Sequence, residues 1–437
     1  MLLIYLPEIT SRHQYVFNHI FGYLGIDYNF TINREEFIAC DKEKFSYAAT
    51  AVNSELHFSA CGLLNESSIT QFVPQIGEHL GIKTLFRHNA SAAALPYDVF
   101  SAVFYMLSRY EEYLPFEPDQ HGRFEATNSL AYKHQFLYSP VVDHWIVQLA
   151  AALLKHFPTL KIKKHQYEFI PTYDIDMAFS YKHKGFKRTM GGLVRDCFGF
   201  KCGDYFSRMA VLLHIKPDPF DSYDYQFALQ EKFALEPIYF FHAGTYGKFD
   251  KNISPEQKPI TKLIQRIAAN ARLGMHPSYL SAEKPELLSA EIKRMEQACG
   301  QKIRAARQHF IKIRFPETYT NYIANGITDD YSMGYATDIG FRAGTSQPYL
   351  FFDLAKNCAT PLKVHPFAFM EGVFKHYKPV PTNQIIGQIT PLIQQIKALD
   401  GTFISLWHNE SLGTSAHWEG WRTIYETMIV AAQQNNS

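Results

Sequence analysis

Two carboxylates at the end of one β-prone run constrain this chain most. Residues 167–176, Tyr-Glu-Phe-Ile-Pro-Thr-Tyr-Asp-Ile-Asp, are mainly apolar and end in Asp174 and Asp176. Side chains two positions apart leave a strand on the same face, so these carboxylates are expected to converge. Converging carboxylates repel each other unless a cation or a shared proton lies between them. A strand that ends in such a pair suits an α/β barrel, and the alternative is an exposed strand end before a turn.

Apolar runs and helical periodicity alternate after this pair. Strands are expected at 237–244, 272–279 and 402–408, and helices at 259–272, 285–298, 382–398 and 418–432. A long insertion at about 180–222, with glycines and basic residues, is expected to hold a helix near 204–214. This alternation predicts parallel strands joined by helices.

Residues with metal-binding or acid–base chemistry recur where the expected strands end. A single histidine at such a place is more readily interpreted as a packed or surface residue than as a ligand. Five histidines with two aspartates at successive strand ends instead favour a metal-dependent hydrolase site. The set consists of Asp174, Asp176, His242, His276, Arg307, His309, His365 and His408.

The first 165 residues form a separate unit by pattern. The 437 residues favour two domains over one. Residues 1–165 show an opening strand and helices at 13–24, 96–115 and 141–157, and the polar stretch 161–165 marks the boundary. We therefore expect a smaller α/β domain at 1–165 and an α/β barrel at 166–437. Arg109, Glu111 and Glu112 could form a charged site, but a salt-linked helix end is favoured.

Net charge and the spacing of the cysteines indicate which partners and which cellular compartment the chain is expected to have. The net charge of +1, from 43 basic and 42 acidic residues, gives no global field for nucleic acid or an anionic membrane. No apolar run is long enough to span a bilayer. The short apolar opening before Pro7 has no basic leader, and the six cysteines lack Cys-x-x-Cys pairing, so we expect reduced thiols, no signal peptide and a cytoplasmic location.

Taken in order, five segments resemble the polysaccharide deacetylase family, the chitin deacetylase-like carbohydrate esterases, over about 166–437. They are Thr172-Tyr-Asp-Ile-Asp176, Ile238-Tyr-Phe-Phe-His-Ala-Gly244, Leu273-Gly-Met-His-Pro-Ser278, Arg307-Gln-His-Phe310 and Leu406-Trp-His408. The resemblance implies a distorted (β/α) barrel of the polysaccharide deacetylase type. The segment 107–115 resembles the uncharacterised domain that precedes a Bacteroidetes-type subgroup of these enzymes.

The resemblance also implies roles for individual residues. Asp174 matches the catalytic base, and Arg307 matches the arginine that orients it. His408 matches the general acid, while Asp176 and His276 match two metal ligands.

The chain departs from the family where a second metal histidine would follow His276 by four residues, because Leu280 stands there. Arg307 and His309 are two positions apart on an expected strand end, so both can face the site. We therefore expect His309 to be the third metal ligand, with His365 and His242 as the other substitutes.

The expected function is removal of acetyl groups from an N- or O-acetylated carbohydrate, with a divalent cation as cofactor. Zn²⁺ is the expected ion, and other divalent transition metals stay open. Without a signal peptide, a cytoplasmic glycan precursor or lipid-linked sugar is the more natural substrate. Two alternatives remain: an inactive carbohydrate-binding protein on the same fold, motivated by Leu280, and a glycosyltransferase that uses Asp174 and Asp176 to hold a metal and a nucleotide-sugar.

Overall fold

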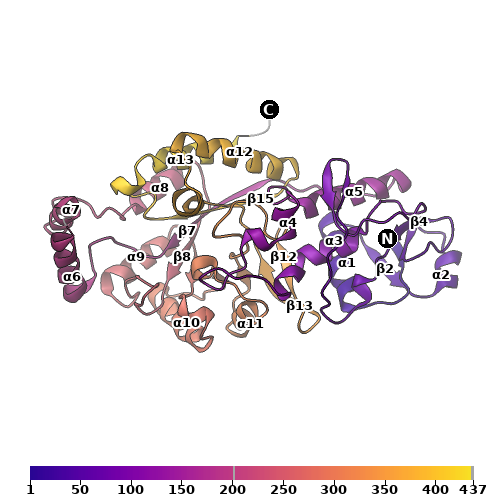
Figure 1. Cartoon of the computed structure of the whole chain (residues 1–437), viewed down its shortest axis with the longest axis horizontal. Coiled ribbons are helices and arrows are strands. Elements are labelled where there is room, and N and C mark those ends of the chain that lie inside the picture. The colour runs from indigo at the N-terminus through magenta and orange to yellow at the C-terminus, as the bar shows by residue number, and fades with distance from the viewer. Residues whose placement is uncertain (200–201, 435–437) are drawn as a thin grey trace.

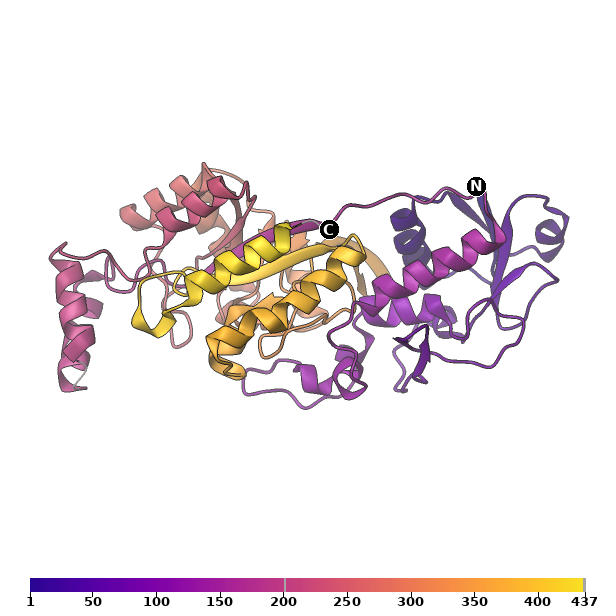
Figure 2. The same cartoon turned by 90° about the horizontal axis from the view of Figure 1, so that it is seen from above.

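A computed structural model describes residues 1–199 and 202–434 of the chain. The sheet of the N-terminal part lies at one end of an elongated molecule, and the sheet of the C-terminal part lies in its middle (Figure 1). An extended segment after residue 157 leads from the first part to the second (Figure 2). The division at residue 165 as a domain boundary stays a prediction. No helix within the described ranges is both long enough and apolar enough to cross a membrane.

The N-terminal part is a small α/β unit. Its four parallel strands, in the order β2-β1-β3-β4, are β1 (Leu2–Tyr5), β2 (Tyr28–Thr31), β3 (Lys44–Ala48) and β4 (Leu56–Ser59). The helices are α1 (Ser11–Leu24), α2 (Arg34–Ala39), α3 (Val99–Leu107), α4 (Leu130–Lys133) and α5 (Val141–His156), and β5 (Gly77–His79) pairs with β6 (Ile82–Thr84).

Helix α3 is shorter than the helix expected at 96–115. Every residue of α3 is buried, because the helix crosses the core of the N-terminal part. It ends beside Arg109, whose φ of 52° is left-handed, and a 3₁₀ turn from Tyr110 to Tyr113 follows. A left-handed residue cannot continue an α-helix, so the periodic pattern beyond 108 belongs to a separate turn.

The C-terminal part contains one nine-stranded sheet in the order β12-β13-β11-β10-β9-β8-β7-β15-β14. Only β12 and β13 pair antiparallel within it. The described strands β12 and β14 are the two edges and do not pair, so the expected barrel is not closed by hydrogen bonds. The strands are β7 (Glu168–Ile175), β8 (Ile238–His242), β9 (Arg272–His276), β10 (Ala305–Ala306), β11 (Asp329–Asp330), β12 (Tyr349–Asp353), β13 (Cys358–Val364), β14 (Phe369–Met370) and β15 (Thr402–His408).

Amphipathic helices connect the strands of this sheet. In α9, Ile260, Leu263, Ile264 and Ile267 are buried at the helical spacing that lets one face pack on the core. The helices are α6 (Gly185–Phe198), α7 (Cys202–Leu212), α8 (Tyr223–Lys232), α9 (Lys258–Ala268), α10 (Glu286–Cys299), α11 (Glu317–Ala324), α12 (Thr382–Ala398) and α13 (Trp421–Gln433). Helix α6 had no counterpart among the sequence expectations.

The register of the central strands brings the expected site to one edge. Asp174 of β7 is paired in register with His408 of β15, and His242 of β8 with His276 of β9. Strand β10 ends at Ala306, so Arg307 follows it directly. Because these strands are parallel, all of their carboxyl ends lie at the same edge of the sheet.

A buried ion network joins the two parts of the chain. Glu112 accepts hydrogen bonds from Nε of Arg109 at 2.8 Å and from Nε of Arg342 at 2.9 Å. Arg109 also pairs with Glu111 at 2.9 Å. The charged residues after α3 therefore form a salt-linked helix end, as favoured from the sequence, and the network also reaches Arg342 in the other part.

Candidate metal centre and active site

Strand β7 places two carboxylates in different surroundings. Asp174 lies on the strand and is 2% exposed, whereas Asp176 follows it and its side chain is 37% exposed. Despite that exposure, Oδ1 of Asp176 is buried and accepts no hydrogen bond. A buried carboxylate oxygen without a donor costs free energy unless something else neutralises it.

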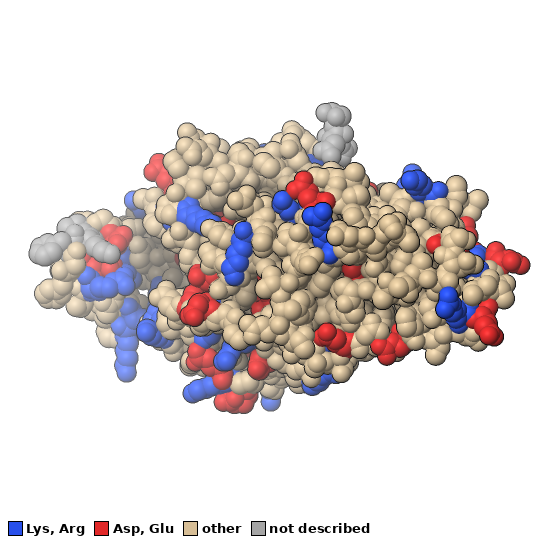
Figure 3. Space-filling view, turned by 45° about the vertical axis from the view of Figure 1, so that its right-hand side comes forward, with Lys and Arg blue, Asp and Glu red and all other residues tan. Residues whose placement is uncertain are grey.

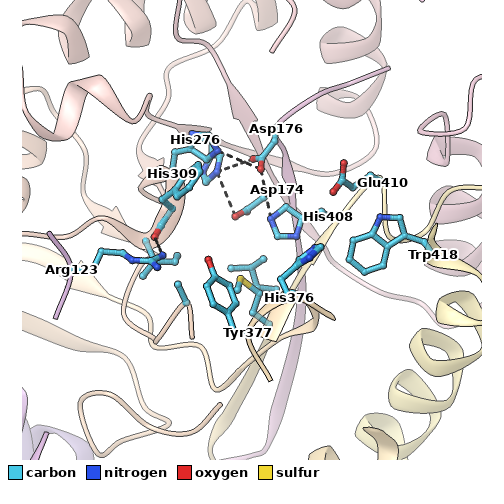
Figure 4. A pocket seen from close by; sticks show the side chains of 16 residues that line it. Arg123, Asp174, Asp176, His276, His309, His376, Tyr377, His408, Glu410 and Trp418 are labelled. Atoms are coloured by element: carbon cyan, nitrogen blue, oxygen red, sulfur yellow. Dashed lines mark hydrogen bonds and ion pairs between the residues drawn. The ribbon is translucent and has the colours of Figure 1, made fainter. Parts of the chain in front are cut away.

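Two histidines bring their Nε2 atoms to Asp176 (Figure 4). Nε2 of His276 lies 3.1 Å from Oδ1 of Asp176, and Nε2 of His309 lies 3.4 Å from Oδ2. One ligand atom from each of these three residues lies within 4.8 Å of the other two. The residues expected as metal ligands therefore converge.

The outer hydrogen bonds of both histidines favour a cation at this point. Nδ1 of His276 lies 2.6 Å from the carbonyl oxygen of Arg307, and Nδ1 of His309 lies 2.9 Å from Oδ1 of Asp250. Those oxygens only accept, so both Nδ1 atoms carry protons. If both rings are neutral, their Nε2 lone pairs point at the carboxylate of Asp176. That arrangement is unfavourable unless a proton or a metal ion lies between the Nε2 atoms and the carboxylate oxygens. A carbonyl or carboxylate behind each ring is the usual arrangement of metal-binding histidines.

The pKa values of His309 and Asp176 show that this site attracts positive charge, whether a proton or a metal cation. Burial alone lowers the pKa of His309, but Asp176 and Asp250 outweigh burial and raise it to about 9. Burial likewise raises the pKa of Asp176, yet His309 and His276 hold it well below the usual range. These groups fit a divalent cation, which would replace the protons between the histidines and Asp176.

Beside this cluster, Asp174 is tied to Arg307. Nη1 of Arg307 donates to Oδ1 of Asp174 at 2.8 Å and also to Thr172. The guanidinium is fully buried, and its Nε donates to the carbonyl oxygen of Tyr331. Oδ2 of Asp174 lies 3.7 Å from Nε2 of His276 and lines the cavity. Asp174 is thus a carboxylate that Arg307 holds in place next to the cluster.

His408 lies on the other side of Asp176 and has its own carboxylate. Oε1 of Glu371, directly after β14, lies 2.8 Å from Nδ1 of His408 and accepts its backbone N–H. Burial lowers the pKa of His408, but Glu371 outweighs it and holds the pKa well above the ordinary value. Nε2 lies 3.8 Å from Oδ2 of Asp176. The carboxylate of Glu371 therefore favours the protonated form of the His408 imidazole, which lines the cavity.

These groups line a cavity of about 220 Å³. Tyr377 and Trp418 add aromatic faces (Figure 4). Glu410 lines it too, and burial raises the pKa of this carboxyl to about 7. Arg123, from the N-terminal part, lines the same cavity and donates to the carbonyl oxygen of Phe310 at 2.8 Å. The N-terminal part thus contributes one residue, Arg123, to the wall of the cavity.

The other two candidate substitutes occupy different positions. Nε2 of His242 lies 2.8 Å from Oδ1 of Asp250, so His242 adjoins the cluster from behind. His365 pairs with Asp329 at 2.8 Å and stacks on Tyr331, outside the cluster.

The sequence predicted that His309 faces the site, but not the backbone that places it there. His309 does not continue a strand but begins a 3₁₀ turn in which Phe310 has a φ of 62°. The sequence expectations missed Asp250, Glu371, Glu410 and Arg123. Glu371 follows β14, a two-residue strand that no sequence pattern marked. The contacts that bring Asp250 to His309 and Arg123 to Phe310 join positions 59 and 187 apart.

Residues 2–158 match a protein family described only as a family of unknown function (DUF7033), and no curated protein matches the chain. Among solved structures, a protein from Mycobacterium smegmatis, provisionally described as a polysaccharide deacetylase, is 13% identical, with a TM-score of 0.39 over 62% of this chain and 86% of that one. A polysaccharide deacetylase from Bacillus cereus is 9% identical, with a TM-score of 0.28 over 61% and 89%. A 4-alpha-glucanotransferase from Thermococcus litoralis is 14% identical, with a TM-score of 0.32 over 62% and 37%. Likenesses this distant say nothing about chemistry.

Proposed function

We propose that this chain is a metal-dependent hydrolase that removes acetyl groups from an N- or O-acetylated carbohydrate. The observation that carries the proposal is the convergence of Asp176, His276 and His309 in one cavity with Asp174 and His408. The order of the five sequence segments that resemble polysaccharide deacetylases supports the same chemistry and the same distorted (β/α) barrel.

In this proposal Asp176, His276 and His309 hold the cation. Two imidazoles and one carboxylate suit zinc and other divalent transition metals, and leave positions open for water and substrate. When bound, such an ion would polarise the acyl carbonyl and acidify water. The third ligand that Leu280 cannot supply comes from His309. The loss of the family histidine is therefore no longer a reason to propose an inactive protein.

The chain's own residues account for the proton movements. Asp174, held by Arg307, accepts a proton from the water that attacks the acyl carbon. The bond between that carbon and the sugar nitrogen or oxygen then breaks. His408, protonated and oriented by Glu371, donates its Nε2 proton to the leaving amine or hydroxyl. The products are acetate and the deacetylated sugar. Tyr377 and Trp418 offer faces on which a sugar ring can lie.

Metal content and acetate release, measured on the same samples, test the assignment. We expect the purified chain, loaded with zinc, to release acetate from N-acetylated oligosaccharides. Asp174→Asn should lower turnover about a hundredfold or more while the metal stays bound. Asp176→Asn and His309→Ala should lose metal. His365→Ala, a buried histidine at the same sheet edge, is the matched control and should retain it.

Each contrary outcome has a meaning. Equal metal loss in the Asp174 and Asp176 variants would show that base and ligand are wrongly assigned. If His309→Ala retained its full metal content while His365→Ala lost metal, the assignment of His309 as the third metal ligand would be refuted. Sugar binding without acetate release would favour the inactive alternative, and binding of nucleotide-sugars alone would favour a glycosyltransferase.

A further inference from the structure

A helical hairpin formed by α6 and α7 projects from the body of the molecule (Figures 1 and 2). The two helices are linked by a buried ion pair, in which Nε of Arg208 donates to Oδ2 of Asp196 at 2.8 Å. The base is fixed to the body, since Asp218 accepts the backbone N–H groups of residues 180–182, and Arg188 donates to the carbonyl oxygens of Lys251 and Asn252. The hairpin is thus an anchored projection.

The outer face of this hairpin is apolar. Along α6 the side chains of Phe186, Met190, Val194 and Phe198 recur every four residues, so they follow one side of the helix. Their exposed fractions are 81%, 42%, 51% and 80%. Phe206 on α7, with Leu213 and Ile215 directly after it, is also exposed. Such a continuous exposed stripe marks an interaction surface rather than ordinary scatter.

The same segment carries a strong positive charge. Residues 182–216, the hairpin together with its base, have a net charge of +6 in a chain whose net charge is +1, and residues 185–212 alone have a net charge of +3. Figure 3 shows Lys and Arg side chains gathered on this projecting end. The basic residues are Lys182, Lys184, Lys187, Arg188, Arg195, Lys201, Arg208 and Lys216, and the acidic ones are Asp196 and Asp204.

We propose that the α6–α7 hairpin binds the surface of an anionic lipid bilayer. An exposed apolar stripe flanked by Lys and Arg is the pattern of helices that lie in the membrane interface. The 14 residues of α6 reach only about 21 Å, less than the roughly 30 Å of a bilayer core, so the helix lies on the membrane rather than across it. A second copy of the chain is a poorer occupant, because two segments that each carry a net positive charge would repel each other.

The position of the hairpin in the chain relates the proposed membrane-binding surface to the cavity. The hairpin is inserted between β7 and α8, only a few residues after Asp176, on the edge of the sheet where the cavity lies. A bilayer bound there would hold the cavity close to the headgroups, where a lipid-linked substrate resides. Lipid binding itself needs no turnover, so the inference stands or falls separately from the proposed function.

Co-sedimentation of the full chain with vesicles tests the proposal. The vesicles contain phosphatidylcholine alone or phosphatidylcholine with about 30 mol% phosphatidylglycerol, which gives the surface a negative potential. We expect binding to the anionic vesicles only, weakened as the NaCl concentration rises. Phe186→Ser/Val194→Ser/Phe198→Ser should weaken binding at least about tenfold. Lys187→Gln/Arg195→Gln should weaken it about thirtyfold.

Val73→Ser/Leu80→Ser is the matched control, because these side chains are 74% and 79% exposed in the N-terminal part. It should bind like the unchanged chain, and circular dichroism should show every variant folded. Lack of binding to anionic vesicles by the unchanged chain would overturn the proposal, as would equal binding by the hairpin variants. Loss of a dimer in the triple variant, seen by light scattering without any lipid binding, would identify a second copy as the occupant.

Discussion

Asp250 should control metal affinity although it is not among the proposed metal ligands. Its Oδ1 accepts hydrogen bonds from Nδ1 of His309 at 2.9 Å, Nε2 of His242 at 2.8 Å and the backbone N–H of Tyr279 at 2.8 Å. The carboxylate thereby keeps the proton of His309 on Nδ1 and turns Nε2 toward Asp176. The perturbation that isolates this role is Asp250→Asn, which preserves the shape and removes the charge.

The expected size of the effect follows from what remains. The amide oxygen of the introduced asparagine can still accept the hydrogen bond from Nδ1 of His309, so His309 stays near its position. A neutral acceptor nevertheless makes the imidazole a weaker donor of its lone pair. Removing partners of this kind lowers metal affinity by about 10–100-fold, equivalent to about 1.4–2.7 kcal/mol. Complete loss of binding is not expected, because Asp176 and His276 are untouched.

The assay is competition for Zn²⁺ between the metal-free protein and a chromogenic chelator. The matched control is Asp329→Asn, because Asp329 makes the same kind of contact with His365, at 2.8 Å, but outside the cluster. Thermal unfolding of the metal-free variants checks that both are folded. An affinity within about twofold of the unchanged chain for Asp250→Asn, or an equal loss for Asp329→Asn, would refute the reasoning.

Two further predictions concern stability. Glu112→Gln should lower the free energy of unfolding by about 3–5 kcal/mol in urea titrations, because it leaves Arg342 buried without its carboxylate and weakens the pair with Arg109. The control Glu78→Gln, at an exposed position, should lower it by less than about 1 kcal/mol. Equal losses in the two variants would contradict the role of the buried network. Burial lowers the pKa of His13 to about 4 in the folded chain. Between about pH 6.5 and pH 4 the unfolded chain therefore binds more protons than the folded chain does. As the pH falls through this range, up to about 3 kcal/mol of the free energy of unfolding present at neutral pH should be lost. His13→Gln should flatten that dependence, and an unchanged slope of unfolding free energy against pH would contradict it.

The amino-acid sequence by itself determined the parallel α/β plan and the edge of the sheet that carries the chemistry. Strand and helix periodicities are local properties, and parallel strands necessarily share a carboxyl edge. The sequence alone is therefore sufficient to group Asp174, Asp176, His276 and His408. The position of Arg307 directly after a short strand was predictable for the same reason.

Tertiary structure alone decided the partners of these groups. Asp250 lies 59 positions from His309, and Glu371 lies 37 positions from His408. The periodicity of one strand or helix cannot link residues across such distances. His309 reaches the cluster through a turn with left-handed backbone rather than along a strand.

The relation between the two parts of the chain was also beyond sequence reasoning. Arg342 joins the charged residues after α3 across 230 positions, and Arg123 reaches the cavity from the N-terminal part. The sequence marked the basic insertion, but only the folded chain reveals that α6 projects with its apolar side uncovered. Local patterns fix which face of an element is apolar, whereas the packing of distant elements decides whether that face is covered.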